Sequence, residues 1–421
     1  MSLIFSFMKK KKDTNPKVDE SELYARMKEH LYSKKSLLGE DSPFSELLQQ
    51  LVDKMLEGEI ESFLDEEKAA GKTNKRNGHT SKQVLSESGI LSIKSPRDRN
   101  SDFEPQLVSK RQRELSSGLD DQILALYAQG NSIEDVRRLL MKIYGVDISA
   151  GKISQITDKI LPQIQEWRDR PLAVFYAIVY LDAVYFKVRY EGRYVNRAFY
   201  TVYAVTWDGQ RDLLGMYIQS GEGAHRWGIV LEDLRRRGVQ DILVICTDNL
   251  KGFSETINEV FPHSIVQKCI VHQVRNSLKF VDDQDRKKLT VDLRKVYTAT
   301  TREQAELALE AFAVKWDEKY EYIARNWREN WDELVAFMDF PKDMRRMIYT
   351  TNPVEALHRI IRKIVKSKAA WVSDTALIKQ LYLSLMHNEK SWKRKAYGWK
   401  SIQRDLLKQY EKRINQWTVQ N

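Results

Sequence analysis

The chain has 421 residues, which is enough for several domains and at least one large hydrophobic core. Hydrophobic residues make up 42% of the chain and aromatic residues 10%, which favours a globular protein over a disordered one. Cys246 and Cys269 are the two cysteines, so the sequence excludes a disulfide framework and favours a reducing, cytoplasmic compartment. We find no apolar run long enough to cross a membrane.

The excess positive charge lies at the C-terminal end of the chain. The net charge is +10, and residues 355–421, with 15 basic and 5 acidic side chains, account for all of it. A basic segment of this kind favours contact with a phosphate backbone, and we expect Lys393 and Arg394 to hold DNA there. The alternative is a solvated basic helix.

Residues 1–41 are expected to be a disordered or frayed segment. The basic run near its start follows an apolar stretch, which is the reverse of the order in a signal peptide. Residues 42–115 are expected to hold a helix over 42–70, capped by Ser42, and then a basic hairpin that turns at Ser88 and Gly89.

Residues 116–170 show three helical patterns in succession. Two helices joined by a short turn, after a third helix, predict a helix-turn-helix DNA-binding domain. Its recognition helix would span residues 150–160, and the candidate DNA contacts are Lys152, Ser154, Gln155 and Lys159. A plain three-helix bundle would give the same pattern, so both interpretations stay open.

The pattern changes to that of β-structure after residue 170. Three runs rich in β-branched and aromatic residues, joined by the turns EGR and WDGQ, predict three consecutive antiparallel strands. A helix, a buried strand over 241–248, a second helix and a strand over 264–270 follow. The order β-β-β-α-β-α-β within residues 171–280 is that of the ribonuclease H-like fold, so the expected class is α/β with this core.

Two acidic residues are expected to meet in this core. Asp182 lies inside the first apolar strand, where an unpaired charge is costly, and Asp248 comes directly after the fourth strand. These strands are neighbours in the ribonuclease H topology, and chemistry in open α/β sheets sits at such strand ends. The pair would bind Mg²⁺ or Mn²⁺ through hard oxygen ligands. Taken singly, Asp182 could instead form a buried salt bridge and Asp248 could cap a helix.

A third acid is expected from a later helix, and Glu355 in the stretch TTNPVEALHRIIRK is the candidate. Glu355 lies much further along the chain from Asp248 than a ribonuclease H-like core needs, which predicts a helical domain inserted over residues 281–347. A catalytic helix and a basic helical segment are then expected over residues 348–421. Glu355 begins a helix stripe whose other members would hold successive phosphates: Arg359, Arg362 and Lys366. The alternative is that Glu355 is only a capping-box residue.

Eight blocks of sequence, in order, carry a resemblance to a known family. They are KRNGHTSK, SPRDRNSDFEPQLVSKRQR, YGVDISAGKISQITDKIL, YLDAVYFKVR, LLGMYIQSGEGAHRWGIVLEDLRRRGV, TDNLKGF, CIVHQVRN and TTNPVEALHR. From about Ser42 onward, the chain resembles the bacterial insertion-sequence transposases of the Mutator-like group, of the insertion sequence 256 type. The resemblance implies an acidic (DDE) triad made of Asp182, Asp248 and Glu355.

The resemblance also points to Cys269 and His272 as the Cys-x-x-His element of that family. A zinc site is one interpretation, with Cys246 on the neighbouring strand as a third ligand. We favour a packing role for Cys269 at the strand end, with His272 meeting a DNA phosphate or a catalytic acid.

Three tryptophans of the insertion have two possible roles. They could stack on unpaired bases near the cleavage site, but their helical spacing favours a helical core: Trp316, Trp327 and Trp331.

The sequence therefore predicts a transposase that binds the terminal inverted repeats of a mobile DNA element, cleaves the ends by metal-dependent hydrolysis, and joins 3′ hydroxyl ends to target DNA. Two Mg²⁺ or Mn²⁺ ions per active site would be the cofactor. The expected partners are double-stranded DNA and further copies of the chain, which would form a homodimer or higher oligomer on DNA. The expected location is the bacterial cytoplasm, in association with the nucleoid, and no contact with a membrane is expected. The alternatives are a structure-selective ribonuclease H-like nuclease and a non-catalytic DNA-binding protein derived from a transposase.

Overall fold

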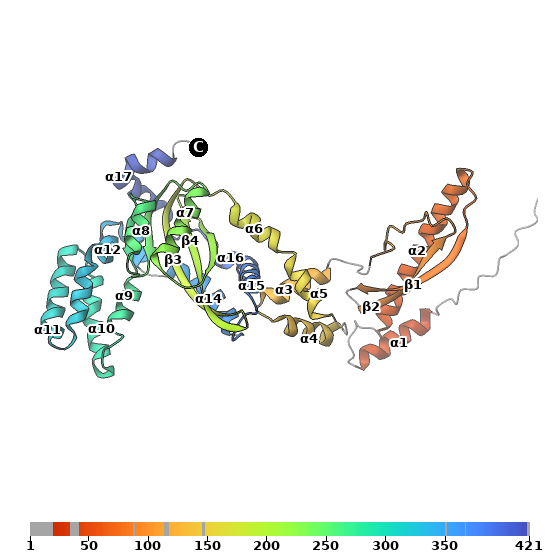
Figure 1. Cartoon of the computed structure of the whole chain (residues 1–421), viewed down its shortest axis with the longest axis horizontal. Coiled ribbons are helices and arrows are strands. Elements are labelled where there is room, and N and C mark those ends of the chain that lie inside the picture. The colour runs from red at the N-terminus through yellow and green to blue at the C-terminus, as the bar shows by residue number, and fades with distance from the viewer. Residues whose placement is uncertain are drawn as a thin grey trace, which may run out of the picture. The chain divides into compact units, whose positions relative to one another are not determined.

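The computed structural model describes residues 20–33, 42–86, 89–112, 118–144, 148–349, 352–366 and 368–418. The chain divides into two compact units, one made of Met1–Ile123 with Ile133–Gln155 and the other of Leu124–Ser132 with Ile156–Asn421. Figure 1 labels the helices and strands along the chain. Among the described residues, no helix combines the length and the apolar character that a membrane span needs.

The first unit contains a long helix packed against a β-hairpin. Helix α2 (Pro43–Ala69) begins after Ser42, whose hydroxyl accepts a hydrogen bond from Phe44 N, as predicted for an N-cap. Strands β1 (Arg76–Ser86) and β2 (Gly89–Asp98) pair antiparallel. Helix and hairpin share an apolar cluster that includes Val52, Leu56, Val84, Leu91, Ile93 and Val108.

Helix α1 (Glu20–Tyr32) lies in the segment that we expected to be frayed. Its sequence is rich in good helix formers, and Arg26 forms an ion pair with Glu46 of α2 at 3.0 Å. The prediction is therefore wrong for these residues, whereas residues 1–19 and 34–41 lie outside the described part of the chain.

Four short helices follow the hairpin: α3 (Gly118–Ala128), α4 (Ile133–Tyr144), α5 (Ala150–Asp158) and α6 (Leu161–Asp169). Helix α5 ends two residues before the predicted end, because the chain turns there into α6, which has a proline in its first turn. The boundary between the two units falls within α3 and α5.

The second unit is built on a mixed five-stranded sheet. Its strands are β3 (Phe175–Tyr190), β4 (Arg193–Thr206), β5 (Arg211–Gln219), β6 (Asp241–Thr247) and β7 (Ile265–Lys268), in the spatial order β5-β4-β3-β6-β7. The first three strands pair antiparallel, while β6 runs parallel to β3 and β7 runs parallel to β6. With α7 (Ala224–Arg236) and α8 (Phe253–Val260), the observed order along the chain is the predicted β-β-β-α-β-α-β.

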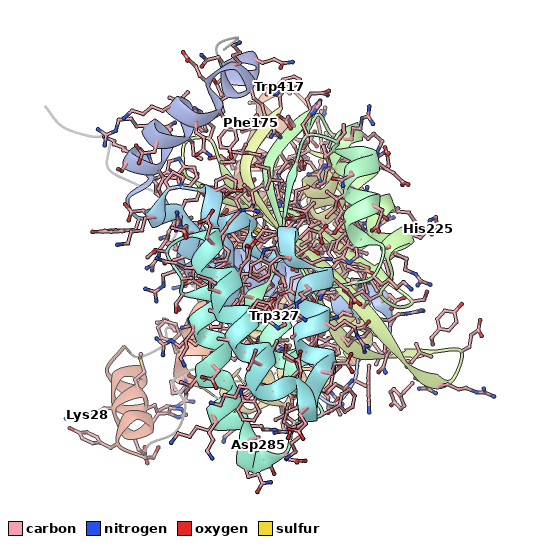
Figure 2. All side chains as sticks on the ribbon, turned by 90° about the vertical axis from the view of Figure 1, so that its left-hand side faces the viewer. Lys28, Phe175, His225, Asp285, Trp327 and Trp417 are labelled. Atoms are coloured by element: carbon pink, nitrogen blue, oxygen red, sulfur yellow. The ribbon has the colours of Figure 1, made fainter. Side chains whose placement is uncertain are left out.

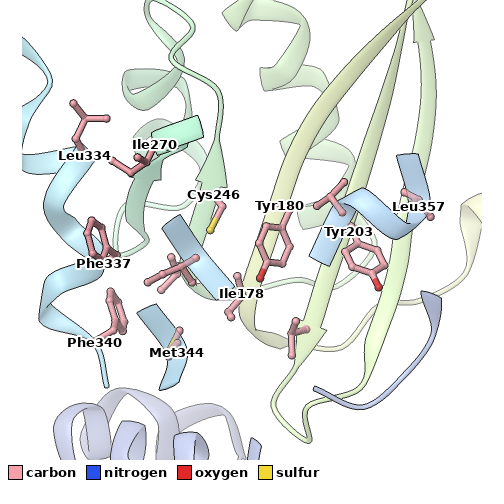
Figure 3. Close-up of a cluster of buried hydrophobic side chains, with 14 of the residues drawn as sticks. Ile178, Tyr180, Tyr203, Cys246, Ile270, Leu334, Phe337, Phe340, Met344 and Leu357 are labelled. Carbon is pink, nitrogen blue, oxygen red and sulfur yellow. The ribbon is translucent and has the colours of Figure 1, made fainter. Parts of the chain in front are cut away.

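Each face of this sheet belongs to its own hydrophobic cluster. On one face Trp227 of α7 and Phe253 of α8, both fully buried, join a cluster with strand residues such as Val179 and Leu181. The other face carries a larger cluster that reaches into the C-terminal helices. Figure 3 shows part of that cluster, to which the strands and α14 contribute Tyr180, Tyr203 and Leu357.

Helix α9 (Ile270–Ser277) follows β7, before the predicted insertion. The helices at the place of that insertion are α10 (Asp283–Tyr297), α11 (Arg302–Glu329), α12 (Trp331–Val335), the short 3-10 helix η1 (Ala336–Asp339) and α13 (Lys342–Tyr349). Its long helix α11 carries two buried tryptophans, Trp316 and Trp327, of which Figure 2 labels Trp327. Trp316 Nε1 donates to Asp292 Oδ2 at 3.0 Å, and Trp327 Nε1 donates to Ser277 Oγ at 2.9 Å. These contacts make both rings part of the helical core.

Four helices complete the chain: α14 (Asn352–Lys366), α15 (Asp374–His387), α16 (Glu389–Trp392) and α17 (Trp399–Thr418). The predicted apolar stripe of α14 is buried, with Val354, Leu357, Ile361 and Ile364 facing the core. Part of the basic charge in this region is structural, because Arg413 of α17 forms an ion pair with Asp241 of β6 at 2.8 Å.

Candidate active site

The register of the sheet brings the two predicted aspartates level with each other. Tyr180 of β3 pairs with Cys246 of β6 in a parallel ladder. Asp182 comes two residues after Tyr180, and Asp248 comes two residues after Cys246. Asp182 is buried at the middle of β3, where its Oδ1 accepts a hydrogen bond from Ala183 N at 2.8 Å. Asp248 follows the last residue of β6. Both acids thus lie just past the point where the parallel pairing of β3 with β6 ends.

The electrostatics of Asp182 show that the two carboxylates interact. Burial, and next the negative charge of Asp248, raise the pKa of Asp182 to about 7. A buried carboxylate that faces a second carboxylate is costly when both are ionised. The arrangement therefore favours either a shared proton or a bound cation.

His272 holds Asp248 from the side of α9. Its Nδ1 lies 2.5 Å from Asp248 Oδ1, so His272 contacts one of the two predicted acids. The close contact with the Asp248 carboxylate, and next that with Cys269, raises the pKa of His272 to about 10. Cys269 precedes α9, and its backbone N donates to Thr247 O at 2.8 Å. The Cys-x-x-His element therefore fixes the end of β6 and the carboxylate that follows it.

His358 of α14 lies against the other aspartate, and the sequence analysis missed it. Its Nδ1 is 3.3 Å from Asp182 Oδ2, and the side chain is buried. Burial, and next the positive charge of Arg362, lower the pKa of His358 to about 4, so the imidazole is neutral at neutral pH. His358 Nε2 is buried without a hydrogen-bond partner within the described part of the chain. The sequence held one sign of this role: His358 stands beside the apolar stripe, three residues after the predicted third acid, and so on the same side of the helix.

Glu355 lies in the first turn of α14, three residues before His358. Residues three apart occupy the same side of a helix, and His358 touches Asp182, so the backbone of Glu355 is on the side of the helix that approaches the acidic pair. The side chains of Glu355 and Lys366 lie outside the described residues, so the assignment of Glu355 stays a prediction. Arg359 and Arg362 are exposed on the same helix.

A further carboxylate, Glu222, approaches the pair from the loop between β5 and α7. Burial, and next the charge of Asp248, raise its pKa. Its Oε2 accepts a hydrogen bond from Tyr185 OH of β3 at 3.2 Å. Sequence reasoning missed Glu222 because a loop residue has no periodicity, and only the tertiary fold brings it to the strand ends.

The predicted DNA contacts lie on the protein surface. Gln155 and Lys159 are exposed, and Lys152 and Ser154 are half-buried; Lys159 lies in the turn after α5. Lys393 and Arg394 are exposed after α16, and Lys393 Nζ forms an ion pair with Glu389 at 2.7 Å.

A cavity of about 1240 Å³ lies between the loop after Asp248 and the helical insertion. Its lining includes Asn249, Lys251, Phe280, Arg325 and Trp331. Trp331 is half-buried, unlike the two core tryptophans of the insertion.

The donor chemistry of this site suits Mg²⁺ or Mn²⁺. Asp182 and Asp248 present carboxylate oxygens side by side, and hard divalent cations prefer such ligands. Within the described residues, no group of three His, Cys, Asp or Glu side chains is arranged to hold a metal ion. Cys246, Cys269 and His272 are among these described residues, and they do not form the three-ligand zinc site that was considered for them. Glu355 is the predicted third oxygen ligand, and its side chain is not among those that the structure describes.

Comparisons with known proteins point to a family of transposases. Residues 20–395 match the model of the family described as "Transposase, Mutator family". The chain is 40% identical over 365 residues to the transposase for insertion sequence element ISRM3 of Rhizobium meliloti, covering 86% of this chain and 91% of that protein. It is 25% identical over 329 residues to the transposase for insertion sequence element IS256 in transposon Tn4001 of Staphylococcus aureus, covering 77% of this chain and 84% of that protein.

Among solved structures, the chain is similar to the Drosophila P element transposase strand transfer complex, with a TM-score of 0.29 and 8% identity over 72% of this chain and 87% of that chain. The family match spans most of the sequence and includes both aspartates and the helix of Glu355. The chain belongs to the Mutator family of transposases and is a transposase of the bacterial insertion-sequence type.

Proposed function

We propose that this transposase cleaves DNA at the ends of its element and joins the freed 3′ hydroxyl groups to target DNA, using a ribonuclease H-like acidic site. The observation that carries the proposal is the sheet register that sets Asp182 level with Asp248. The strand order β5-β4-β3-β6-β7, with β5 to β3 antiparallel and the rest parallel, supports the ribonuclease H-like assignment.

The acidic residues would act as ligands in this mechanism. Asp182, Asp248 and Glu355 would hold two Mg²⁺ or Mn²⁺ ions, which when bound would activate the attacking water or hydroxyl and stabilise the leaving oxygen. His272 keeps Asp248 oriented, and His358 does the same for Asp182. The remaining task of the protein is to position DNA for in-line displacement.

Recognition of the element ends would lie outside the acidic site. We assign it to a helix-turn-helix made by α4 and α5, whose exposed Gln155 would face base edges. Both ends must be held together for joining, so the working form would be a homodimer or a larger assembly on DNA. The basic C-terminal segment would add backbone contacts through Arg394 and Lys393.

The decisive experiment is Asp182→Asn, assayed with duplexes that carry the element ends and Mg²⁺. We expect cleavage and strand transfer to fall by orders of magnitude, while folding and DNA binding stay near normal. Without metal, the variant should be as stable as the parent or slightly more so, because a buried charge and its repulsion by Asp248 are removed. Normal cleavage by this variant would show that the site is wrongly assigned.

The control is Asp208→Asn, which removes the same charge from an exposed position in the turn between β4 and β5 and should leave activity unchanged. Joining of pre-cleaved 3′ hydroxyl ends separates the proposal from its alternatives. A structure-selective nuclease would cut without joining, and a non-catalytic DNA-binding protein would do neither.

A further inference from the structure

Strands β3 and β4 continue well beyond the rest of their sheet. The pairing of β3 with β6 ends at Tyr180, and that of β4 with β5 begins at Ala198, yet β3 and β4 stay paired as far as Tyr190 and Arg193. The turn between them has left-handed backbone at Glu191 (φ 47°) and Gly192 (φ 78°), which suits a tight two-residue hairpin. Figure 2 shows the tip of this hairpin, in yellow-green, projecting away from the sheet. We call residues 185–196 the ribbon.

The two faces of the ribbon differ because side chains alternate along each strand. One face is buried: Phe186 packs its ring 5.2 Å from that of Trp371, and Trp371 N donates to Lys187 O at 2.9 Å. The other face is exposed and carries Tyr185, Lys187, Arg189, Tyr194 and Asn196. The register sets Lys187 opposite Asn196 and Arg189 opposite Tyr194, so these side chains form one continuous strip.

The strip is positively charged. In the described part of the chain, Lys187 and Arg189 have no ion-pair partner, and neither does Arg193 beside the turn. Arg197 on the opposite face, by contrast, pairs with Asp374 at 3.1 Å. Solvated Lys and Arg side chains interleaved with tyrosine hydroxyls are the groups that bind phosphate oxygens of DNA.

The inner end of the strip is connected to the acidic site through Glu222. Tyr185, at its inner end, donates a hydrogen bond to Glu222, which itself lies near Asp248. Asp182 is on the same strand, with its side chain on the opposite face, and a rise of about 3.3 Å per residue puts Lys187 about 17 Å and Arg189 about 23 Å from it along the strand. The basic strip therefore begins beside a carboxylate that lies near Asp248.

We propose that this strip binds the backbone of the duplex whose end occupies the acidic site. The inference rests on the proposed function, since it takes the scissile phosphate to lie at Asp182 and Asp248. Where the duplex runs along the ribbon, its rise of about 3.4 Å per base pair places the contacted phosphates about 5 to 7 base pairs from the cut.

The first test is Lys187→Ala with Arg189→Ala, in an Asp182→Asn background that leaves DNA uncut. Binding to a 30-base-pair duplex of arbitrary sequence is measured by fluorescence anisotropy over a range of salt concentrations. Loss of two phosphate contacts should weaken binding at least tenfold at low salt. It should also make the slope of log affinity against log salt about 2 less steep. The charge-keeping pair Lys187→Arg with Arg189→Lys should restore both values.

The matched control is Lys287→Ala with Lys288→Ala, which removes the same charge from exposed positions on α10. An equal loss of slope in this control would mean that net charge alone matters, and it would overturn the ribbon assignment. Unchanged binding by the ribbon variant would do the same. A loss confined to single-stranded oligonucleotides would show that the strip holds an unpaired strand, which contradicts the duplex proposal.

The second test locates the DNA. An iron chelate attached at Asn196→Cys should cut the backbone of an element-end duplex about 5 to 7 base pairs from the transposase cleavage position. Cys246 and Cys269 are buried, so labelling is selective. Backbone cutting elsewhere, or none, would refute the ribbon. The proposed function is tested separately by the loss of cleavage in Asp182→Asn, so the two failures are distinguishable.

Discussion

Each aspartate of the site has its own histidine, and the two histidines differ in charge. His272 gains a proton through Asp248, whereas His358 stays neutral because it is buried near Arg362. A cationic imidazole can hold a carboxylate electrostatically, while a neutral one orients its partner without adding charge. The two histidines therefore hold the two aspartates at different electrostatic cost. Only one of them, His272, could be singled out from the sequence, through the Cys-x-x-His spacing.

At the same scale, Glu355→Gln separates a catalytic role from a structural one. Glutamine is tolerated in a capping box, so a structural role predicts near-normal activity and at most about 1 kcal/mol of lost stability. We expect instead unchanged folding and DNA binding, with cleavage and strand transfer reduced by orders of magnitude. Glu303→Gln is the control, because Glu303 also lies in the first turn of a helix but outside the site. A Glu355→Gln protein that transposes normally would refute the assignment.

At the level of elements, side-chain amides connect the helical insertion to the five-stranded sheet. Asn249, next to Asp248, donates to Gln273 of α9 at 2.8 Å, and Gln273 donates to Asn326 of α11 at 2.8 Å. Gln267 of β7 donates to Leu334 O at 3.0 Å. Gln267 and Gln273 are fully buried, so breaking either contact would leave unpaired polar groups. The insertion is thus a support for the loop that carries Asp248.

The junction between α10 and α11 offers a stability test. Asp292 is buried, which alone would raise its pKa, but hydrogen bonds from Lys295, Lys315 and Trp316 outweigh burial and lower the pKa to about 2. A lowered carboxylate pKa stabilises the fold above the unfolded value near 4, and this stabilisation is lost as pH falls towards 2. Asp292→Asn should therefore cost up to about 2 kcal/mol at pH 7, and less near pH 3.

Hydrogen exchange of α10 and α11 at the two pH values measures this effect. Asp283→Asn on the same helix is the control, because the side chain of Asp283 is 94% exposed and should contribute little. Equal losses at both pH values would show that Asp292 acts through packing and not through its charge.

At the level of the whole chain, the sequence was most informative where local pattern and burial agree. A charged Asp182 inside an apolar strand, and an apolar run before Asp248, were enough to place both acids once the strand order was assumed. His358 and Glu222 needed tertiary contacts that no spacing encodes. Lys393 was predicted only as a DNA contact, but in the structure it forms an ion pair with Glu389. The spacing of four residues on a helix could have predicted this pair.

The last prediction concerns the division of DNA binding between distant parts of the chain. Arg394 is exposed in the basic segment, and its loss in Arg394→Ala should weaken binding to any duplex and reduce the salt dependence by about one phosphate contact. Gln155 is exposed on α5, and Gln155→Ala should instead reduce the preference for element ends over random DNA, because amide side chains read base edges. Competition binding with end and random duplexes at several salt concentrations measures both effects. The reverse pattern would mean that α5 is not the recognition helix, since a backbone contact changes affinity for every sequence alike whereas a base contact changes the ratio between sequences.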